Sequence, residues 1–160
     1  MEDAVGLRIP DINTLVPEIQ DVTVALAKAT GNGSVPPTTI SLMYLRAGQI
    51  VGNTYQAMRH SVGLRKAGES EDRIAAVATW WDAPYFTAAE RAALALTEAV
   101  FQPNVRGEER VPDDLFAEAS KHYDEKGLST LMVTLGSAGF WMAIALTLKP
   151  PPVGQETEGA

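Results

Sequence analysis

The feature that most constrains the fold is a long uncharged interval near the end of the chain. No residue from Gly127 to Leu148, between Lys126 and Lys149, carries a charge, and this interval is long enough to span a bilayer. It also contains hydroxyl residues and glycines, and helices that are apolar all round occur buried in bundles and oligomers. We therefore expect a buried helix and no membrane span, although the apolar pattern alone does not separate the two.

The rest of the chain also shows helical spacing, and no segment shows sustained alternation of apolar and polar residues. The pattern predicts a helix over about 15–29, one starting at Pro37, and one that follows Gly52 and stops at Ala67-Gly68. Further helices are predicted over 70–80, from a capping box at 87–90 through 101, and over about 112–123. The fold class is therefore all-α, a helical bundle.

Length and composition indicate one soluble domain. A chain of 160 residues and 17.1 kDa falls in the range of a single compact domain, which we place at residues 1–150. Three prolines end the last helix, and the Gly/Glu-rich tail at 151–160 is expected to be disordered. The acidic start has no apolar signal core, so we expect a cytoplasmic location.

Two bulk properties exclude whole classes of function. The net charge of −7 and the lack of a basic cluster argue against a nucleic-acid partner. The chain has no cysteine, which excludes disulfides, thiolate metal sites and cysteine nucleophiles.

A set of three polar residues marks a candidate site. Asn53, Gln56 and His60 are spaced three and four apart, so they project from one face of a helix. Two carboxamides and an imidazole could polarise a carbonyl or enol oxygen and move a proton at neutral pH. The same residues also fit a purely structural role, because Asn53 followed by Gln56 is a capping-box variant. The second histidine, His122, fits a solvated residue near a helix end.

The sequence around this set resembles the alkylhydroperoxidase D (AhpD)-like branch of the carboxymuconolactone decarboxylase superfamily. In that branch a leucine-arginine-alanine-serine-glutamine run leads, through a turn, into a Cys-x-x-Cys-x-x-x-His helix. The corresponding blocks span roughly residues 38–150 of this chain; they are Leu45-Arg46-Ala47-Gly48-Gln49, Asn53 to His60, Arg65 to Glu69, Ala78 to Phe86, Arg91 to Ala99, Val111-Pro112-Asp113 and the apolar helix with Trp141. The resemblance implies the family's helical, oligomer-forming fold.

The departures from the family pattern concern the chemistry. The two family cysteines fall on Asn53 and Gln56, while the histidine is retained as His60. A thiol peroxidase needs one thiolate to attack the peroxide and a second thiol to resolve the sulfenic acid, so we expect peroxidase activity to be lost. The decarboxylase branch lacks the cysteines too, which makes a cysteine-independent lyase or isomerase credible.

Three hypotheses follow. The leading one is a lyase, isomerase or cyclase that needs no cofactor and acts on a small, hydrophobic, enolisable substrate. Its catalytic residues would be His60 as general acid or base, with Gln56 and Asn53; its substrate-binding residues would be Tyr44, Gln49, Tyr55 and Trp81, with Met58 nearby. The second is a binding protein without chemistry.

The third hypothesis is a structural partner in a homo-oligomer, which the long apolar helix favours in any case. A metal held by His60 with Glu98 or Asp82 is a weak option, because the spacing matches no recognised site, and we expect no metal.

Overall fold

Nine helical segments make up the part of the chain that the computed structural model describes, residues 7–154, and strands are absent from that part. They are α1 (Ile12–Leu15), α2 (Glu18–Thr30), α3 (Pro37–Val51), α4 (Thr54–Lys66), α5 (Glu71–Ala76), the 3₁₀ turn η1 (Val77–Thr79), α6 (Ala88–Phe101), α7 (Asp113–Ser120) and α8 (Glu125–Leu148). The prediction of an all-α bundle is confirmed. The predicted disordered tail lies largely outside the described residues.

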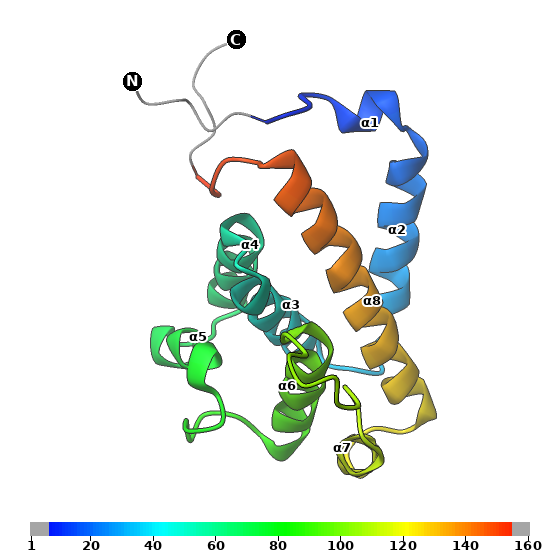
Figure 1. The fold of residues 1–160 in the computed structure, drawn as a ribbon. Helices are drawn as coiled ribbons and strands as arrows, with labels where there is room; N and C mark the ends of the chain where they lie inside the picture. The colour runs from blue at the N-terminus through cyan, green and yellow to red at the C-terminus, as the bar shows by residue number, and fades with distance from the viewer. Residues whose placement is uncertain (1–6, 155–160) are drawn as a thin grey trace.

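Helix α3 is the centre of the bundle and contacts α4, α6 and α8 (Figure 1). Every residue from Leu42 to Gly48 is buried, which is expected of a helix enclosed on all sides. The largest fully buried side chains, Leu42, Met43, Leu45, Leu64, Leu94 and Leu131, belong to helices α3, α4, α6 and α8. Helix α3 is thus the element against which α4, α6 and α8 pack.

Helix α2 lies alongside α8 and away from the rest of the bundle (Figure 1). Most of its residues are exposed, and apolar residues such as Val24 are among them. At the far end of α8, the Arg8 amide donates a hydrogen bond to the Leu148 carbonyl at 3.0 Å, which ties the start of the described chain to the end of that helix.

Some predicted boundaries differ from the structure. The predicted helix over 15–29 is divided, because Leu15 ends α1 and Pro17 stands at the N-cap of α2. The segment over 70–80 is α5 followed by the turn η1, and α7 ends at Ser120 rather than near Tyr123. The capping box between Thr87 and Glu90 is confirmed, with both reciprocal hydrogen bonds formed.

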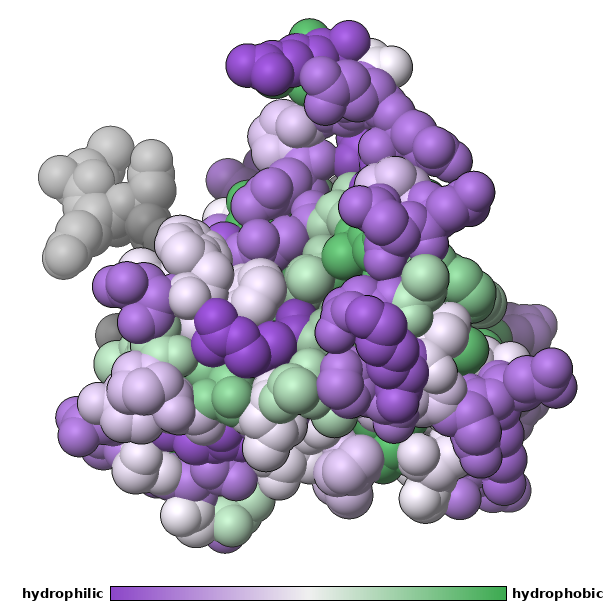
Figure 2. Space-filling view, turned by 90° about the horizontal axis from the view of Figure 1, so that it is seen from below, coloured by the Kyte–Doolittle hydropathy of each residue, from purple (hydrophilic) through white to green (hydrophobic). Residues whose placement is uncertain are grey.

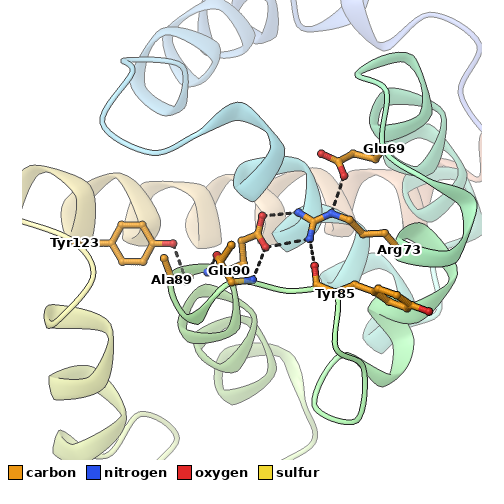
Figure 3. Close-up of polar contacts among 7 residues, drawn as sticks. Glu69, Arg73, Tyr85, Ala89, Glu90 and Tyr123 are labelled. Carbon is orange, nitrogen blue, oxygen red and sulfur yellow. Dashed lines mark hydrogen bonds and ion pairs between the residues drawn. The ribbon is translucent and has the colours of Figure 1, made fainter.

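A polar cluster joins α5 to the first turn of α6 (Figure 3). The Arg73 guanidinium binds both Glu90 oxygens and lies 2.6 Å from a Glu69 oxygen, and it also donates to the Tyr85 carbonyl. Nearby, the Tyr123 hydroxyl donates to the Ala89 carbonyl at 2.7 Å. These contacts fix the loop before α6.

Among residues 7–154, only α8 is long and apolar enough to cross a membrane. Only 33% of its most apolar window is buried, so the expectation of a buried helix holds for one face of α8, while residues such as Met132 and Phe140 are exposed. The absence of a membrane span stays a prediction.

Candidate functional site

Asn53 begins helix α4 as its N-cap. Its side-chain oxygen accepts a hydrogen bond from the Gln56 amide at 2.8 Å, and Gly52, with φ of 73°, provides the left-handed residue that ends α3. The structural interpretation of Asn53 as a cap is therefore confirmed. The Gln56 carboxamide makes no reciprocal bond to the cap within the described residues, so the capping box is incomplete and this side chain is left for another role.

A cavity of about 480 Å³ that is open to solvent on one side lies beside this part of α4, between the α1–α2 arm and α8. Gln56 and His60 line it from α4. Its other walls are predominantly apolar and include Ile12, Ile19, Leu26, Tyr44, Tyr55, Trp141, Ile144 and Leu148. An apolar cavity with a few polar groups is the usual form of a small-molecule site.

The His60 ring is held by stacking against Tyr44. The two ring centroids are 4.6 Å apart and their planes differ by 11°. The Tyr44 hydroxyl donates a hydrogen bond to the Ser137 Oγ at 2.5 Å, which connects α3 to α8. The aromatic pair therefore fixes the imidazole at the cavity wall through contacts with two other helices.

Burial keeps the imidazole neutral. The pKa of His60 falls from an ordinary 6.5 to about 4, first because burial disfavours the charged ring and second because the Arg59 charge repels it. The pKa of Tyr44 is raised by burial, against the opposing effect of its bond to Ser137. At neutral pH the stacked pair is thus an uncharged imidazole and an uncharged phenol.

Arg59 is the one charged residue among the described residues that line the cavity. Its Nη1 atom donates to the Tyr55 hydroxyl at 3.3 Å. Because no described carboxylate lines the cavity, its electrostatic character is cationic although the chain as a whole has a net charge of −7. A ligand that develops negative charge is favoured over one that develops positive charge.

Two residues predicted to bind substrate lie outside this cavity lining. Gln49 accepts a bond from Arg46 at 3.4 Å, and the exposed Trp81 ring lies 5.7 Å from the Arg46 guanidinium. Arg46 is itself paired with Glu98 at 2.8 Å, and the Trp80 indole donates to the same Glu98 oxygen. These residues form a separate polar cluster.

The structure therefore brings together four of the seven predicted site residues, Tyr44, Tyr55, Gln56 and His60. The metal option gains no support, since the Glu98 carboxylate is taken up by Arg46 and Trp80 and residues 7–154 hold no group of three or more candidate ligands.

Comparison with known proteins identifies the lineage of this fold. The sequence model of the carboxymuconolactone decarboxylase family matches residues 17–99, which is just over half of the chain. The chain belongs to this family. The match covers α2 to α6 and includes the whole α4 part of the cavity wall.

Individual relatives agree with this assignment. The uncharacterized protein YdfG of Bacillus subtilis is 28% identical over 134 residues, which cover 84% of this chain and 89% of YdfG. A crystal structure from Agrobacterium tumefaciens, described as a protein of unknown function and putative antioxidant defence protein AhpD, superposes with a TM-score of 0.81 at 26% identity, covering 95% of this chain and 99% of that one. This decarboxylase-family chain is thus an AhpD-like member without the cysteine pair.

A more distant structure shares the fold alone. The debrominase Bmp8, in a complex with 2,3,4-tribromopyrrole, superposes with a TM-score of 0.76 at 15% identity, covering 88% of this chain and 74% of that one. Its apo form gives a TM-score of 0.72 at the same identity, covering 86% and 74%.

Sequence reasoning missed three parts of the site in this family member. The spacing does not point to Arg59, which lies one position from the three-residue face of α4, and no sequence signal connects the α1–α2 arm with the cavity. Ser137 gave no signal, because α8 is apolar on nearly every side and its sequence does not show which hydroxyl faces a cavity.

Proposed function

We propose that this family member is a lyase or isomerase that needs no cofactor and acts on a small, hydrophobic, enolisable substrate bound in the cavity beside α4. His60 accepts a proton from the carbon next to a carbonyl group. The C–H electron pair then forms the enol double bond, and the carbonyl oxygen takes the negative charge. Where a C=C bond is conjugated with the enolate, His60 returns the proton to the γ carbon and the carbonyl reforms, which completes an isomerisation. Where the β carbon carries a leaving group, the reforming carbonyl expels it and His60 gives its proton to that group, which completes an elimination.

The observation that carries this proposal is the uncharged imidazole at the wall of a cavity of about 480 Å³. Only the neutral ring can accept a proton, and burial keeps it neutral at pH 7. A ring with so low a pKa is a weak base in the empty cavity, but an enolate formed beside it stabilises the imidazolium. The Gln56 carboxamide and Arg59 are placed to stabilise the same oxygen charge.

Under this proposal the protein is not a thiol peroxidase. Asn53 and Gln56 stand where the resemblance to the AhpD-like branch implies its two cysteines, and a carboxamide can form neither a sulfenic acid nor a disulfide. The fold nevertheless hosts catalysis on small cyclic molecules elsewhere, since Bmp8 is a debrominase that binds a tribromopyrrole. We propose a comparably small substrate here.

A binding protein without turnover is the second candidate. Two observations favour it: the Asn53 oxygen is already used as a helix cap, and the pKa of His60 is low for a general base. The cavity would then hold its ligand through Gln56, Arg59 and the aromatic wall.

One experiment separates the two candidates. Ligands that copurify with the protein are released and identified by mass spectrometry, then incubated with fresh protein while products are followed. The enzyme proposal predicts conversion, with kcat reduced about 100-fold or more by His60→Gln and unchanged by His122→Gln, the other histidine of the chain. Conversion that survives His60→Gln removes the catalytic role, and bound ligand that is never converted leaves the binding protein.

A further inference from the structure

Ser137 differs from the other hydroxyl residues of α8. The hydroxyls of Ser129, Thr130, Thr134 and Thr147 each donate to the carbonyl four residues earlier, at 2.7 to 2.8 Å. Within the described residues Ser137 makes no such bond, and its Oγ instead accepts the proton of the Tyr44 hydroxyl. Ser137 is also the only one of the five that lines the cavity.

The bond from Tyr44 determines where the proton of Ser137 can go. A serine hydroxyl has one proton to donate and two lone pairs to accept with, and one lone pair is occupied by the Tyr44 hydroxyl at 2.5 Å. Accepting a hydrogen bond polarises a hydroxyl and strengthens the bond that it donates. Because Ser137 lines the cavity and no described bond uses its proton, an occupant of the cavity can accept that proton.

The rest of the same α8 face is apolar. Trp141, Ile144, Ala145 and Leu148 follow Ser137 at helical spacing and line the cavity with it. On this face the Ser137 hydroxyl is the only hydroxyl among the described lining residues, and the Trp141 indole N–H is the only other side-chain polar group. A ligand lying along it places apolar atoms against Trp141 and Leu148 and an acceptor oxygen at Ser137.

We propose that Ser137, held by Tyr44, donates the hydrogen bond that anchors a carbonyl or enolate oxygen of the ligand in the cavity beside α4. This rests on the cavity being the ligand site, as proposed above, but not on turnover. It assigns the ligand class as a hydrophobic molecule with one acceptor oxygen. Ser137 is then a substrate-binding residue and Tyr44 a positioning residue.

The test uses two probes of nearly equal shape, acetophenone and α-methylstyrene, which differ in having a carbonyl oxygen or a methylene group. Binding is measured by titration with the whole protein, and the carbonyl stretch of bound acetophenone is recorded by infrared spectroscopy. Acetophenone should bind several-fold tighter than α-methylstyrene, and its carbonyl frequency should fall on binding.

Three variants then assign the donor. Ser137→Ala should weaken acetophenone binding by about threefold to tenfold, the range of a neutral hydrogen bond, and return the carbonyl frequency toward its value in an apolar solvent. Its effect on α-methylstyrene should be within about twofold. Ser129→Ala, the matched control on the same helix, should change neither probe, because that hydroxyl is already used by the Glu125 carbonyl.

Tyr44→Phe should reduce the frequency shift in part, since the freed Ser137 hydroxyl can then turn to the backbone of its own helix. Three results would overturn the proposal. The wild type binds both probes equally, the folded protein does not bind acetophenone, or the carbonyl frequency of bound acetophenone is the same in Ser137→Ala as in the wild type. If the protein prefers the carbonyl probe but converts no ligand, only the proposed catalysis is contradicted, and the role of Ser137 in binding stands.

Discussion

His60 couples the site to the stability of the protein at the scale of a single residue. Its pKa is about 4 in the folded state and 6.5 for an ordinary histidine, so between these values the unfolded chain binds a proton that the folded chain does not. Stability therefore rises with pH across this window and is lost as the pH falls from about 6.5 to 4.

We predict that His60→Gln flattens the pH dependence of unfolding. A shift of this size corresponds to roughly 3 kcal/mol of stability lost on acidification of the wild type, and glutamine has no charge to acquire. Urea unfolding at pH 7 and pH 4.5 measures the difference. His122→Gln is the control, and a wild-type-like slope in His60→Gln would contradict the assignment of the buried ring.

The sequence made only part of the site predictable at this scale. Asn53 could be recognised as a cap because capping is local, and its hydrogen bond spans three residues. The sequence predicts Tyr44 in the same site as His60, but it does not predict the stacking of the two rings or the bond from Tyr44 to Ser137, 93 positions away, because both depend on how α3 packs against α4 and α8. Proximity in sequence predicts Gln49 in the site and aromatic character predicts Trp81, but the fold places both against Arg46.

At the scale of elements, the close approach of α3 and α4 positions the cavity wall. A Cβ at Gly48 would lie 3.0 Å from the Ala57 backbone nitrogen and 3.5 Å from the Asn53 carbonyl oxygen. Both neighbours belong to the start of α4, so the absence of a side chain at Gly48 allows that turn to lie against α3.

We predict that Gly48→Ala destabilises the protein by about 1–3 kcal/mol, because backbone atoms must move to admit the methyl group. Gly63→Ala, on the other end of α4, is the matched control, since nothing lies within 4 Å of its Cβ; it should stabilise by about 0.5–1 kcal/mol through helix propensity. Thermal unfolding of the two variants should move in opposite directions.

The contacts of Glu90 hold α5 against the first turn of α6 (Figure 3). Its carboxylate accepts from Arg73 at 3.1 Å and from the Thr87 amide at 2.9 Å, and the residue is 9% exposed. We predict that Glu90→Gln costs about 1–3 kcal/mol, because it leaves the half-buried Arg73 guanidinium with Glu69 as its remaining carboxylate partner.

Glu71→Gln provides the comparison for this prediction. It removes the partner of Arg65 in an exposed ion pair and should leave the free energy of unfolding nearly unchanged, because solvent screens such pairs. Equal costs for Glu71→Gln and Glu90→Gln in chemical unfolding would show that the Arg73 cluster contributes no more than a surface pair.

Local signals in the sequence predict that most of the helices exist, but they predict the ends of the helices less well. The capping box of α6 was identified from four consecutive residues. Pro17 was not recognised as a break, because the apolar spacing of Leu15 and Ile19 continues through it although the helix does not. The break matters for the site, since Ile12 and Ile19 line the cavity from either side of it.

At the scale of the whole molecule, the exposed apolar residues on the outer face of α8 need an explanation. Its exposed residues include Met132, Val133, Gly136 and Phe140, and the helix carries no charge after Lys126. A contiguous exposed apolar face of this kind marks a contact site. The face seen from below shows hydrophobic surface only in separate places between hydrophilic residues (Figure 2).

We predict that the protein is a dimer or higher homo-oligomer in which this face of α8 packs against another copy. Light scattering should give a multiple of 17.1 kDa. Gly136 is exposed and nothing lies within 4 Å of its Cβ position, so Gly136→Glu is compatible with the isolated fold but places a charge in a close helix contact. It should lower the measured mass toward that of one chain and weaken association at least 10-fold. Gly63→Glu, also on an exposed and open helical position, should leave the mass unchanged. If the wild type has the mass of one chain, the predicted oligomer does not form. If Gly136→Glu keeps the mass of the wild-type oligomer, the chains contact one another through a face other than that of α8.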